Sequence, residues 1–241
     1  METKEHVYAR KASCQAYQID LDKLYYHKII RAVHRFSGNS KGRLLDVGCW
    51  DGMLASQFLT EREVYGLEGN LEAGERANQR GVKTQSVDLE KGFPFEDGFF
   101  DTVIAAEIIE HVYDTDLFLK EIKRVLRPGG TLVMSIPNMA SLSNRIRMLF
   151  GAYPRNAEYR AGGAGHIRFY TAPVFKAQVQ EAGFEVLDYA GCNLPLPMHH
   201  PLIPKWLKKI AAFGGDYFPN LAGQVILAGR KLNASGTLAG S

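Results

Sequence analysis

Two histidines and two glutamates have the types and the spacing of groups that do chemistry. Glu107, Glu110 and His111 lie three or four residues apart, so one helical turn would bring their side chains to the same face. His166 lies further along the chain, in the run Gly-His-Ile-Arg-Phe-Tyr-Thr. Carboxylates and imidazoles bind divalent cations, and an imidazole with a pKa of roughly 6.5 can also take a proton from a hydroxyl group.

Three interpretations of these residues stay open. Glu107, Glu110, His111 and His166 could hold a divalent ion, Mg²⁺ or Mn²⁺. His111, His166 and Glu107 could instead be catalytic groups in a pocket without a metal, with one histidine as the general base. In the third interpretation the residues are structural and only cap a helix or fix a loop.

A glycine turn that follows a buried strand is the second pattern with chemical meaning. The strand ends near Asp46, and Gly48 and Gly52 lie in the turn after it. Gly48 can adopt backbone angles closed to other residues, which lets the main chain approach a ligand at the carboxyl edge of a parallel sheet. The next strand ends at Glu68, whose carboxylate could accept both hydroxyls of a ribose. Together these features predict a ligand that contains a nucleoside.

The residues of the turn favour S-adenosylmethionine (SAM) over a dinucleotide. A dinucleotide site uses the pattern Gly-x-Gly-x-x-Gly, and the residues after Gly48 are Cys, Trp, Asp, Gly and Met, so its second and third glycines are missing. The acidic Asp51 beside a helix N-terminus would also repel a pyrophosphate. SAM carries no phosphate, and the ammonium of its amino-acid end would suit Asp46.

Strand and helix signals alternate around these residues. We expect strands over residues 43–47, 64–67, 82–86, 101–106, 131–136, 185–190 and 224–230. We expect helices over residues 20–36, 52–60, 71–80, 116–126, 139–150 and 172–182, with Asp116 and Thr171 as N-caps. This alternation predicts an α/β fold with a doubly wound, mostly parallel sheet and a small lid or substrate subdomain.

Further short motifs follow in order along the chain. They are Ser-Val-Asp-Leu at 86–89, Phe-Pro-Phe at 93–95, Phe-Phe-Asp-Thr-Val at 99–103, Glu-Ile-Ile-Glu-His at 107–111 and Leu-Arg-Pro-Gly-Gly at 126–130. With the glycine turn and Glu68, the chain resembles class I SAM-dependent methyltransferases, in the group that contains the ubiquinone-biosynthesis methyltransferases. The resemblance is close over residues 42–136 and looser over residues 165–183. One departure is Trp50, which stands where the family usually has glycine.

The resemblance implies a Rossmann-like SAM methyltransferase fold with seven strands and a SAM site. The implied cofactor-binding residues are Asp46, Gly48, Cys49, Gly52, Glu68, Asp88, Leu89 and Glu107. In the family, an acid at the position of Asp88 reads the adenine amino group. A similar Glu-x-x-Glu-His motif with a distal histidine binds a metal in small-RNA 2′-O-methyltransferases.

The resemblance also divides the chain. Residues 1–37 are expected to form an N-terminal helical lid, residues 38–138 the SAM-binding core and residues 139–171 an inserted lid. Residues 172–232 are expected to complete the sheet and to carry an inserted basic segment, and residues 233–241 to form a flexible tail. Asn138, Arg168 and Tyr170 are the expected substrate-binding residues.

The implied reaction is O-methylation of a hydroxyl on a small molecule, a sugar or a lipid-linked acceptor. One alternative is a metal-assisted RNA 2′-O-methyltransferase, although the chain has no recognisable RNA-binding module. Another is a non-catalytic SAM-fold protein that acts as a partner or regulator. The sequence does not fix the acceptor, because one fold serves many substrates.

Charge is distributed unevenly over the 241 residues, whose formal net charge is +3. Residues 139–241 hold 11 basic and 5 acidic side chains, so we expect an anionic acceptor over a cationic one. The basic, amphipathic segment 205–213 could touch a membrane surface. The charged N-terminus does not read as a signal peptide and the three cysteines form no CxxC pair, so we expect a cytoplasmic location. The oligomeric state is not predicted.

Overall fold

The central sheet is laid out in the computed structural model, which describes residues 24–38, 42–155, 165–192 and 214–232 together with Ala157, Leu194 and Pro204. Within these residues the strand order is β3-β2-β1-β4-β5-β7-β6. The strands are β1 Arg43–Val47, β2 Glu63–Glu68, β3 Lys83–Ser86, β4 Phe100–Ala106, β5 Leu126–Pro137, β6 Phe184–Cys192 and β7 Gln224–Lys231. Strand β7 is antiparallel to both of its neighbours, and the other pairs are parallel. The predicted mostly parallel, seven-stranded sheet is confirmed.

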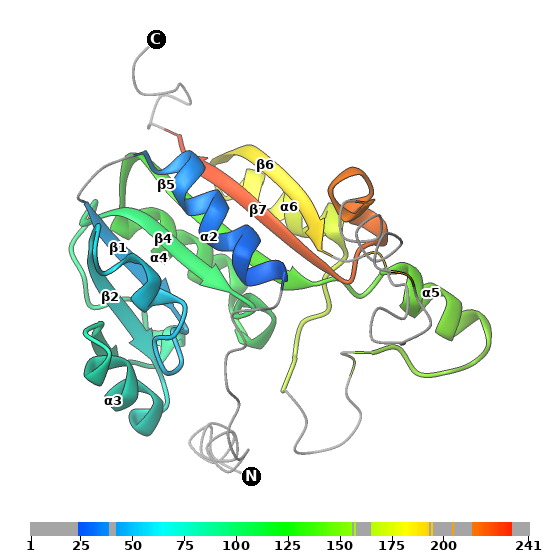
Figure 1. The fold of residues 1–241 in the computed structure, drawn as a ribbon, viewed down its shortest axis with the longest axis horizontal. Helices are drawn as coiled ribbons and strands as arrows, with labels where there is room; N and C mark the ends of the chain where they lie inside the picture. The colour runs from blue at the N-terminus through cyan, green and yellow to red at the C-terminus, as the bar shows by residue number, and fades with distance from the viewer. Residues whose placement is uncertain are drawn as a thin grey trace.

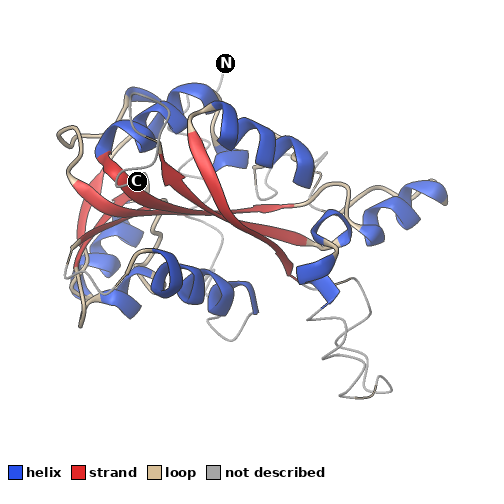
Figure 2. Cartoon of the chain, turned by 90° about the horizontal axis from the view of Figure 1, so that it is seen from above, coloured by secondary structure: helices blue, strands red, loops and turns tan. Residues whose placement is uncertain are grey.

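Helices cover both faces of the sheet (Figures 1 and 2). Helices α2 (Leu24–Phe36) and α3 (Leu71–Gln79) pack on one face, and α4 (Thr115–Val125) and α6 (Ala172–Glu181) on the other. The two faces bury separate clusters of apolar side chains, as expected of a doubly wound sheet. Shorter 3₁₀ turns lie at η1 Ala55–Phe58, η2 Leu89–Lys91, η3 Ile109–His111 and η4 Pro219–Leu221.

Helix α4 shows how local sequence sets an element. Phe118, Leu119, Ile122 and Val125 recur at helical spacing and are all buried against the sheet. Its N-cap is Asp114, whose carboxylate accepts a hydrogen bond from the Leu117 N–H, so the prediction of Asp116 as the N-cap was wrong. Helix α4 begins at Thr115, one residue before the predicted start, so Asp116 lies within its first turn and Asp114 takes the capping position.

Two further expectations differ from the structure. The helix predicted over residues 52–60 is only the 3₁₀ turn η1. Helix α2, expected within a lid over residues 1–37, packs against β5 and β7 instead, and its Ile29 and Val33 are fully buried. An amphipathic pattern reveals an apolar face but not what covers it, and here the sheet covers it. The tail 233–241 and the basic segment 205–213 lie outside the described residues.

The insertion predicted over residues 139–171 is tied to the sheet where it begins and where it ends. Asn138 and Tyr170 form an isolated parallel bridge, and the Met139 N–H donates to the Tyr170 carbonyl at 2.8 Å. Between them lies helix α5 (Leu142–Leu149), which extends from the end of the molecule opposite α3 (Figure 1). The insertion therefore leaves and rejoins the body at one place.

Gly52 lies in the turn after β1 and packs closely against helix α3. Its φ is +74°, and an added Cβ would lie 2.9 Å from Cα and Cβ of Ala77. We expect Gly52→Ala to lower the free energy of unfolding by about 2–4 kcal/mol, from left-handed strain and overpacking together. Denaturant unfolding measures this loss.

Gly38 provides the matched control for Gly52. Its φ is +67°, but nothing lies within 4 Å of an added Cβ. Gly38→Ala should therefore cost only the left-handed strain, about 1–2 kcal/mol. Equal losses in the two variants would contradict a packing role for Gly52.

Candidate functional site

The turn after β1 is held against the end of β2. The N–H groups of Gly48 and Cys49 both donate to the Leu67 carbonyl, at 2.8 and 3.1 Å. Gly48 has φ +76°, and a Cβ there would lie 2.7 Å from Cδ1 of Ile108, beyond the end of β4. Only glycine lets these two loops approach so closely. The glycine turn therefore lies directly beside the Glu107–His111 motif.

The Glu68 carboxylate organises this turn. Its Oε2 accepts the Trp50 N–H and its Oε1 accepts the Asn70 N–H, both at 2.9 Å. Each carboxylate oxygen can accept more than one hydrogen bond, so a carboxylate held in this way suits the two hydroxyls of a ribose. Trp50 has φ +49°, in the left-handed region that favours glycine. This explains why the position is usually glycine in the family that the sequence resembles.

Asp46 is a buried acid at the end of β1. Burial, and to a lesser extent the negative charge of Glu68, raise its pKa to about 7. An approaching cation would favour the charged form, so the site suits an ammonium group. The neighbouring Cys49 is also buried, and burial together with the two acids raises the pKa of its thiol.

Asp51 differs from the expectation drawn from its charge. It is nearly buried, and the Arg80 guanidinium lies against it, with Nη2 3.2 Å from Oδ2 and Nε donating to the Asp51 carbonyl at 2.9 Å. Arg80 therefore offsets the negative charge that would repel a pyrophosphate. A dinucleotide is therefore disfavoured by the two missing glycines and not by the charge of Asp51.

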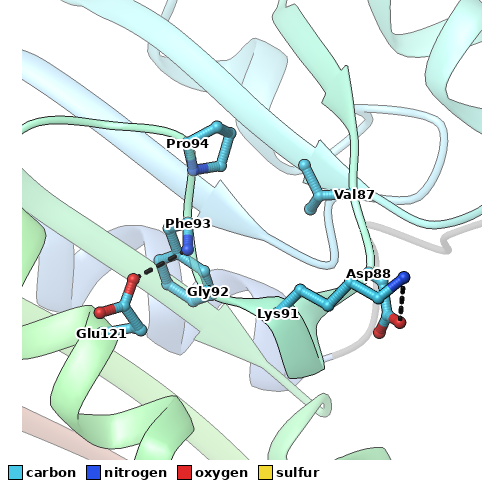
Figure 3. Close-up of a pocket in the computed structure, with 7 residues that line it drawn as sticks. All are labelled: Val87, Asp88, Lys91, Gly92, Phe93, Pro94 and Glu121. Atoms are coloured by element: carbon cyan, nitrogen blue, oxygen red, sulfur yellow. Dashed lines mark hydrogen bonds and ion pairs between the residues drawn. The ribbon is translucent and has the colours of Figure 1, made fainter.

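Asp88 lies at the rim of a pocket of about 340 Å³ (Figure 3). Its carboxylate caps η2 by accepting the Glu90 N–H and lies 3.7 Å from Nζ of Lys91. On the other side, Glu121 accepts the Phe93 N–H at 2.8 Å. Leu89, the other residue predicted here, belongs to the buried core. Of the residues predicted to bind the cofactor, Asp88 alone is among those that line this pocket.

Glu110, His111 and His166 come together in space. Oε1 of Glu110 lies 4.0 Å from Nε2 of His111 and 3.9 Å from Nε2 of His166, and the two imidazole centroids are 4.8 Å apart. Ligand-type atoms of these three residues all lie within 4.8 Å of one another. The Glu110 carbonyl accepts the N–H groups of Ile167 and Arg168 at 2.9 and 3.0 Å. Those two bonds bring His166 to the motif that contains His111.

Glu107 does not join this group among the described residues. Its Oε2 accepts a hydrogen bond from Nε2 of Gln224 at 3.3 Å, and its φ is +53°. The structure thus brings together three of the four predicted metal ligands. The two contacts that sequence reasoning missed, Gln224 with Glu107 and Ile108 with Gly48, join residues far apart in the chain and leave no local signal.

The three predicted substrate-binding residues have different surroundings. Asn138 is buried, and its Nδ2 donates to the carbonyls of Ala222 and Asn220 at 2.9 and 3.2 Å. Tyr170 is also buried, and its hydroxyl donates to Gln178 at 2.8 Å. Arg168 is exposed and donates to the Tyr113 carbonyl at 2.6 Å. Of the three, only Arg168 has a side chain at the surface.

Comparison with known proteins identifies relatives of this chain. Residues 21–189 match the family described as a methyltransferase domain. A ubiquinone biosynthesis O-methyltransferase of Azorhizobium caulinodans is 30% identical over 179 residues, covering 70% of this chain and 66% of that protein. A 27-O-demethylrifamycin SV methyltransferase of Amycolatopsis mediterranei is 30% identical over 159 residues, covering 59% of this chain and 54% of that protein. The matches thus span about one half to two thirds of these two relatives.

A solved structure agrees with the fold. A SAM-dependent methyltransferase of Thermotoga maritima superposes with a TM-score of 0.62, covering 86% of this chain and 89% of that one at 22% identity. At this identity the similarity concerns the fold alone. The match over residues 21–189 extends through the glycine turn, Glu68 and the Glu107–His111 motif. The chain belongs to the methyltransferase-domain family and has the fold of the SAM-dependent methyltransferases.

Proposed function

We propose that this protein transfers a methyl group from SAM to a hydroxyl oxygen of a small-molecule, sugar or lipid-linked acceptor. The observation that carries the proposal is the convergence of Glu110, His111 and His166, at the loop whose Ile108 lies against Gly48 of the glycine turn. Transfer to a hydroxyl requires a group that removes the hydroxyl proton, and imidazole is suited to that role near neutral pH. The relative named as a ubiquinone biosynthesis O-methyltransferase and the one named as a 27-O-demethylrifamycin SV methyltransferase support the choice of oxygen.

The residues around the turn fit the cofactor. When bound, SAM supplies an activated methyl group on a cationic sulfonium. Glu68 is held by two backbone N–H groups in a position to accept the ribose hydroxyls, and Asp46 would pair with the ammonium. Asp88, which caps η2, would bind the adenine amino group, as the resemblance to the family implies. Gly48 lets the main chain come close, and Gly52 lets the turn pack against Ala77 of α3.

His111 is oriented for proton transfer by its contact with the insertion. Its Nδ1 lies 3.1 Å from the Gly165 carbonyl oxygen, which can only accept, so Nδ1 carries the hydrogen in this contact. The lone pair of the neutral ring is then on Nε2, which faces Glu110 and His166. In the proposed step the acceptor oxygen bonds to the methyl carbon as the carbon–sulfur bond breaks. The hydroxyl proton passes to His111 or His166.

A second candidate function rests on the same three residues. A carboxylate oxygen and two imidazole nitrogens that converge are a donor set for Mg²⁺ or Mn²⁺. A metal held by Glu110, His111 and His166 would bind the vicinal hydroxyls of a terminal ribose, as a metal-assisted RNA 2′-O-methyltransferase requires. Glu107 lies against Gln224 and is not needed for this set.

The charge of the lid supports an anionic acceptor. Arg168 lies two residues from His166, and its guanidinium is stacked 5.2 Å from the centroid of the Tyr113 ring. A planar, multi-donor cation fixed in this way suits a carboxylate or phosphate on the acceptor. We therefore propose Arg168 as the residue that binds the acceptor's charge.

The first test removes the imidazoles. His111→Gln and His166→Gln should each lower kcat by about 100-fold or more, because general-base catalysis is worth about 10²–10⁴-fold. SAM affinity, measured by calorimetry, should stay within about twofold, because neither residue is in the proposed cofactor site. His34→Gln, at an exposed histidine in α2, is the matched control. Unchanged turnover in both site variants would exclude a general-base role.

The second test separates the metal-assisted reaction from the metal-free one. If a metal is used, EDTA should abolish turnover and Mg²⁺ or Mn²⁺ should restore it. Mn²⁺ binding measured by electron paramagnetic resonance should then be lost in Glu110→Gln, because the substitution removes the carboxylate from the donor set. Full activity in EDTA, together with no Mn²⁺ binding, would exclude the metal.

The third test uses the raised pKa of Asp46. Below its pKa of about 7 the carboxyl is protonated and neutral, and above it the carboxylate can pair with an ammonium. The affinity for S-adenosylhomocysteine should therefore rise as pH rises through 7, by at most about tenfold per pH unit because one proton is released. Asp46→Asn should flatten this dependence. A pH dependence that persists in Asp46→Asn would assign it to another group.

A further inference from the structure

Helix α5 has few contacts with the other described elements of the protein. It lies at the end of the molecule, away from the two helical layers (Figures 1 and 2). Asn144 is its only buried residue. The Asn144 amide donates to the Met139 and Arg155 carbonyls and accepts the Arg155 N–H at 2.8 Å. One polar side of the helix is therefore anchored, and the opposite side faces solvent.

The solvent-facing side of α5 is apolar. Leu142, Ile146, Leu149 and Phe150 follow the spacing i, i+4, i+7 and i+8, which places them on one stripe of a helix, and we call them the α5 stripe. Leu149 and Phe150 are 79% and 80% exposed. An apolar stripe normally faces a protein core, and this one does not.

Cationic side chains flank the α5 stripe on both sides. With about 100° of rotation per residue, Arg145 falls on one border of the stripe and Arg147 on the other. Their Nε atoms donate to the carbonyls of Ala140 and Tyr153, at 2.7 and 2.8 Å, which fixes their stems beside the helix. Arg155 adds a third charge, and residues 139–155 contain no acidic residue.

Exposed aromatic side chains also lie on the segment next to α5. Nη2 of Arg145 donates to the Asn220 carbonyl at 3.3 Å, so α5 lies beside η4. Tyr217 and Phe218, just before η4, are 81% and 57% exposed. Aromatic rings of this kind are favoured at the boundary between water and lipid.

We propose that α5 is a membrane-docking helix that lies in the surface of an anionic lipid bilayer, with the α5 stripe among the acyl chains and the arginines at the phosphates. Apolar residues on one side and arginines at its borders are the arrangement of an interfacial helix, whose cations bind anionic headgroups. Pairing with a second copy is the less favourable use of this face, because a twofold contact would bring arginines of like charge together. No helix among the described residues is long and apolar enough to cross a bilayer.

Docking through α5 goes beyond methyl transfer and does not depend on it. It would also place the protein well for a lipid-linked acceptor. Strands β4 and β5 are parallel, so α5 begins at the same edge of the sheet as the loop that holds Glu110 and His111. The bilayer surface and the catalytic cluster would then share one edge of the sheet.

The test is co-sedimentation of the full chain with lipid vesicles. Vesicles of phosphatidylcholine with about one phosphatidylglycerol in three should bind the protein at low salt, and pure phosphatidylcholine vesicles should bind it several-fold less. The double variant L149S/F150S should bind the anionic vesicles at least tenfold more weakly. Both side chains are largely exposed, so the variant should keep its Tm and its SAM affinity.

Leu71→Ser is the matched control, because Leu71 is 70% exposed at the start of α3, at the far end of the molecule (Figure 1). It should bind vesicles as the wild type does. Three outcomes would overturn the proposal: no binding to anionic vesicles, equal binding by L149S/F150S, or equal loss in Leu71→Ser. A dimer in sedimentation equilibrium that L149S/F150S dissociates, without vesicle binding, would assign the stripe to self-association.

Discussion

The parallel register of the two central strands is the constraint on which the site depends. Asp46 in β1 lies opposite Ile104 in β4, so the two strands end at nearly the same level and their following loops emerge together. Gly48 then meets Ile108 at a distance that no larger residue permits. A turn suited to a nucleoside and a motif suited to proton transfer thereby become neighbours, although the sequence separates them by the whole β2–β3 unit. The glycine turn and the Glu107–His111 motif meet because the sheet aligns the ends of β1 and β4.

Charge is distributed unevenly along the edge of the sheet where β1 and β2 end. Asp46 and Glu68 end adjacent strands, and their proximity combines with burial to raise the pKa of Asp46. Placing acids so close together costs stability in the free protein, and a cationic ligand would offset that cost. Arg80 balances the charge of Asp51 nearby, and Asp46 is the acid that the proposed ammonium would approach. The insertion, by contrast, is rich in arginines.

The insertion contributes to both sides of the proposed reaction. It begins and ends at the Asn138–Tyr170 bridge, and Asn138 also holds the segment before β7 through its amide. Its last residues bind the Glu110 carbonyl and bring His166 to His111. The first part of the insertion carries α5 and its exposed stripe. The insertion thus completes the cluster of Glu110, His111 and His166 and presents the surface proposed to meet lipid.

The sequence by itself determined the fold class, the cofactor class and most of the elements. Strand–helix alternation, the glycine turn and the acid at the end of the second strand are local patterns that can be seen without knowing what packs where. Errors at this level were also local: residues 52–60 form a short 3₁₀ turn, and the α4 cap is Asp114. Local patterns specify backbone conformation well, because they depend on neighbours in the chain.

Only the tertiary structure decided which charged groups meet. Three of the four predicted ligands converge while Glu107 lies against Gln224, and Asp51 is paired with Arg80. It also decided that the apolar face of α2 packs on the sheet while that of α5 faces solvent. Helical spacing shows that a stripe exists in both cases. Whether another element covers the stripe depends on the register of the strands and on the positions of the loops. Both are set by contacts between residues that are far apart in the sequence, so the spacing within one helix cannot reveal them.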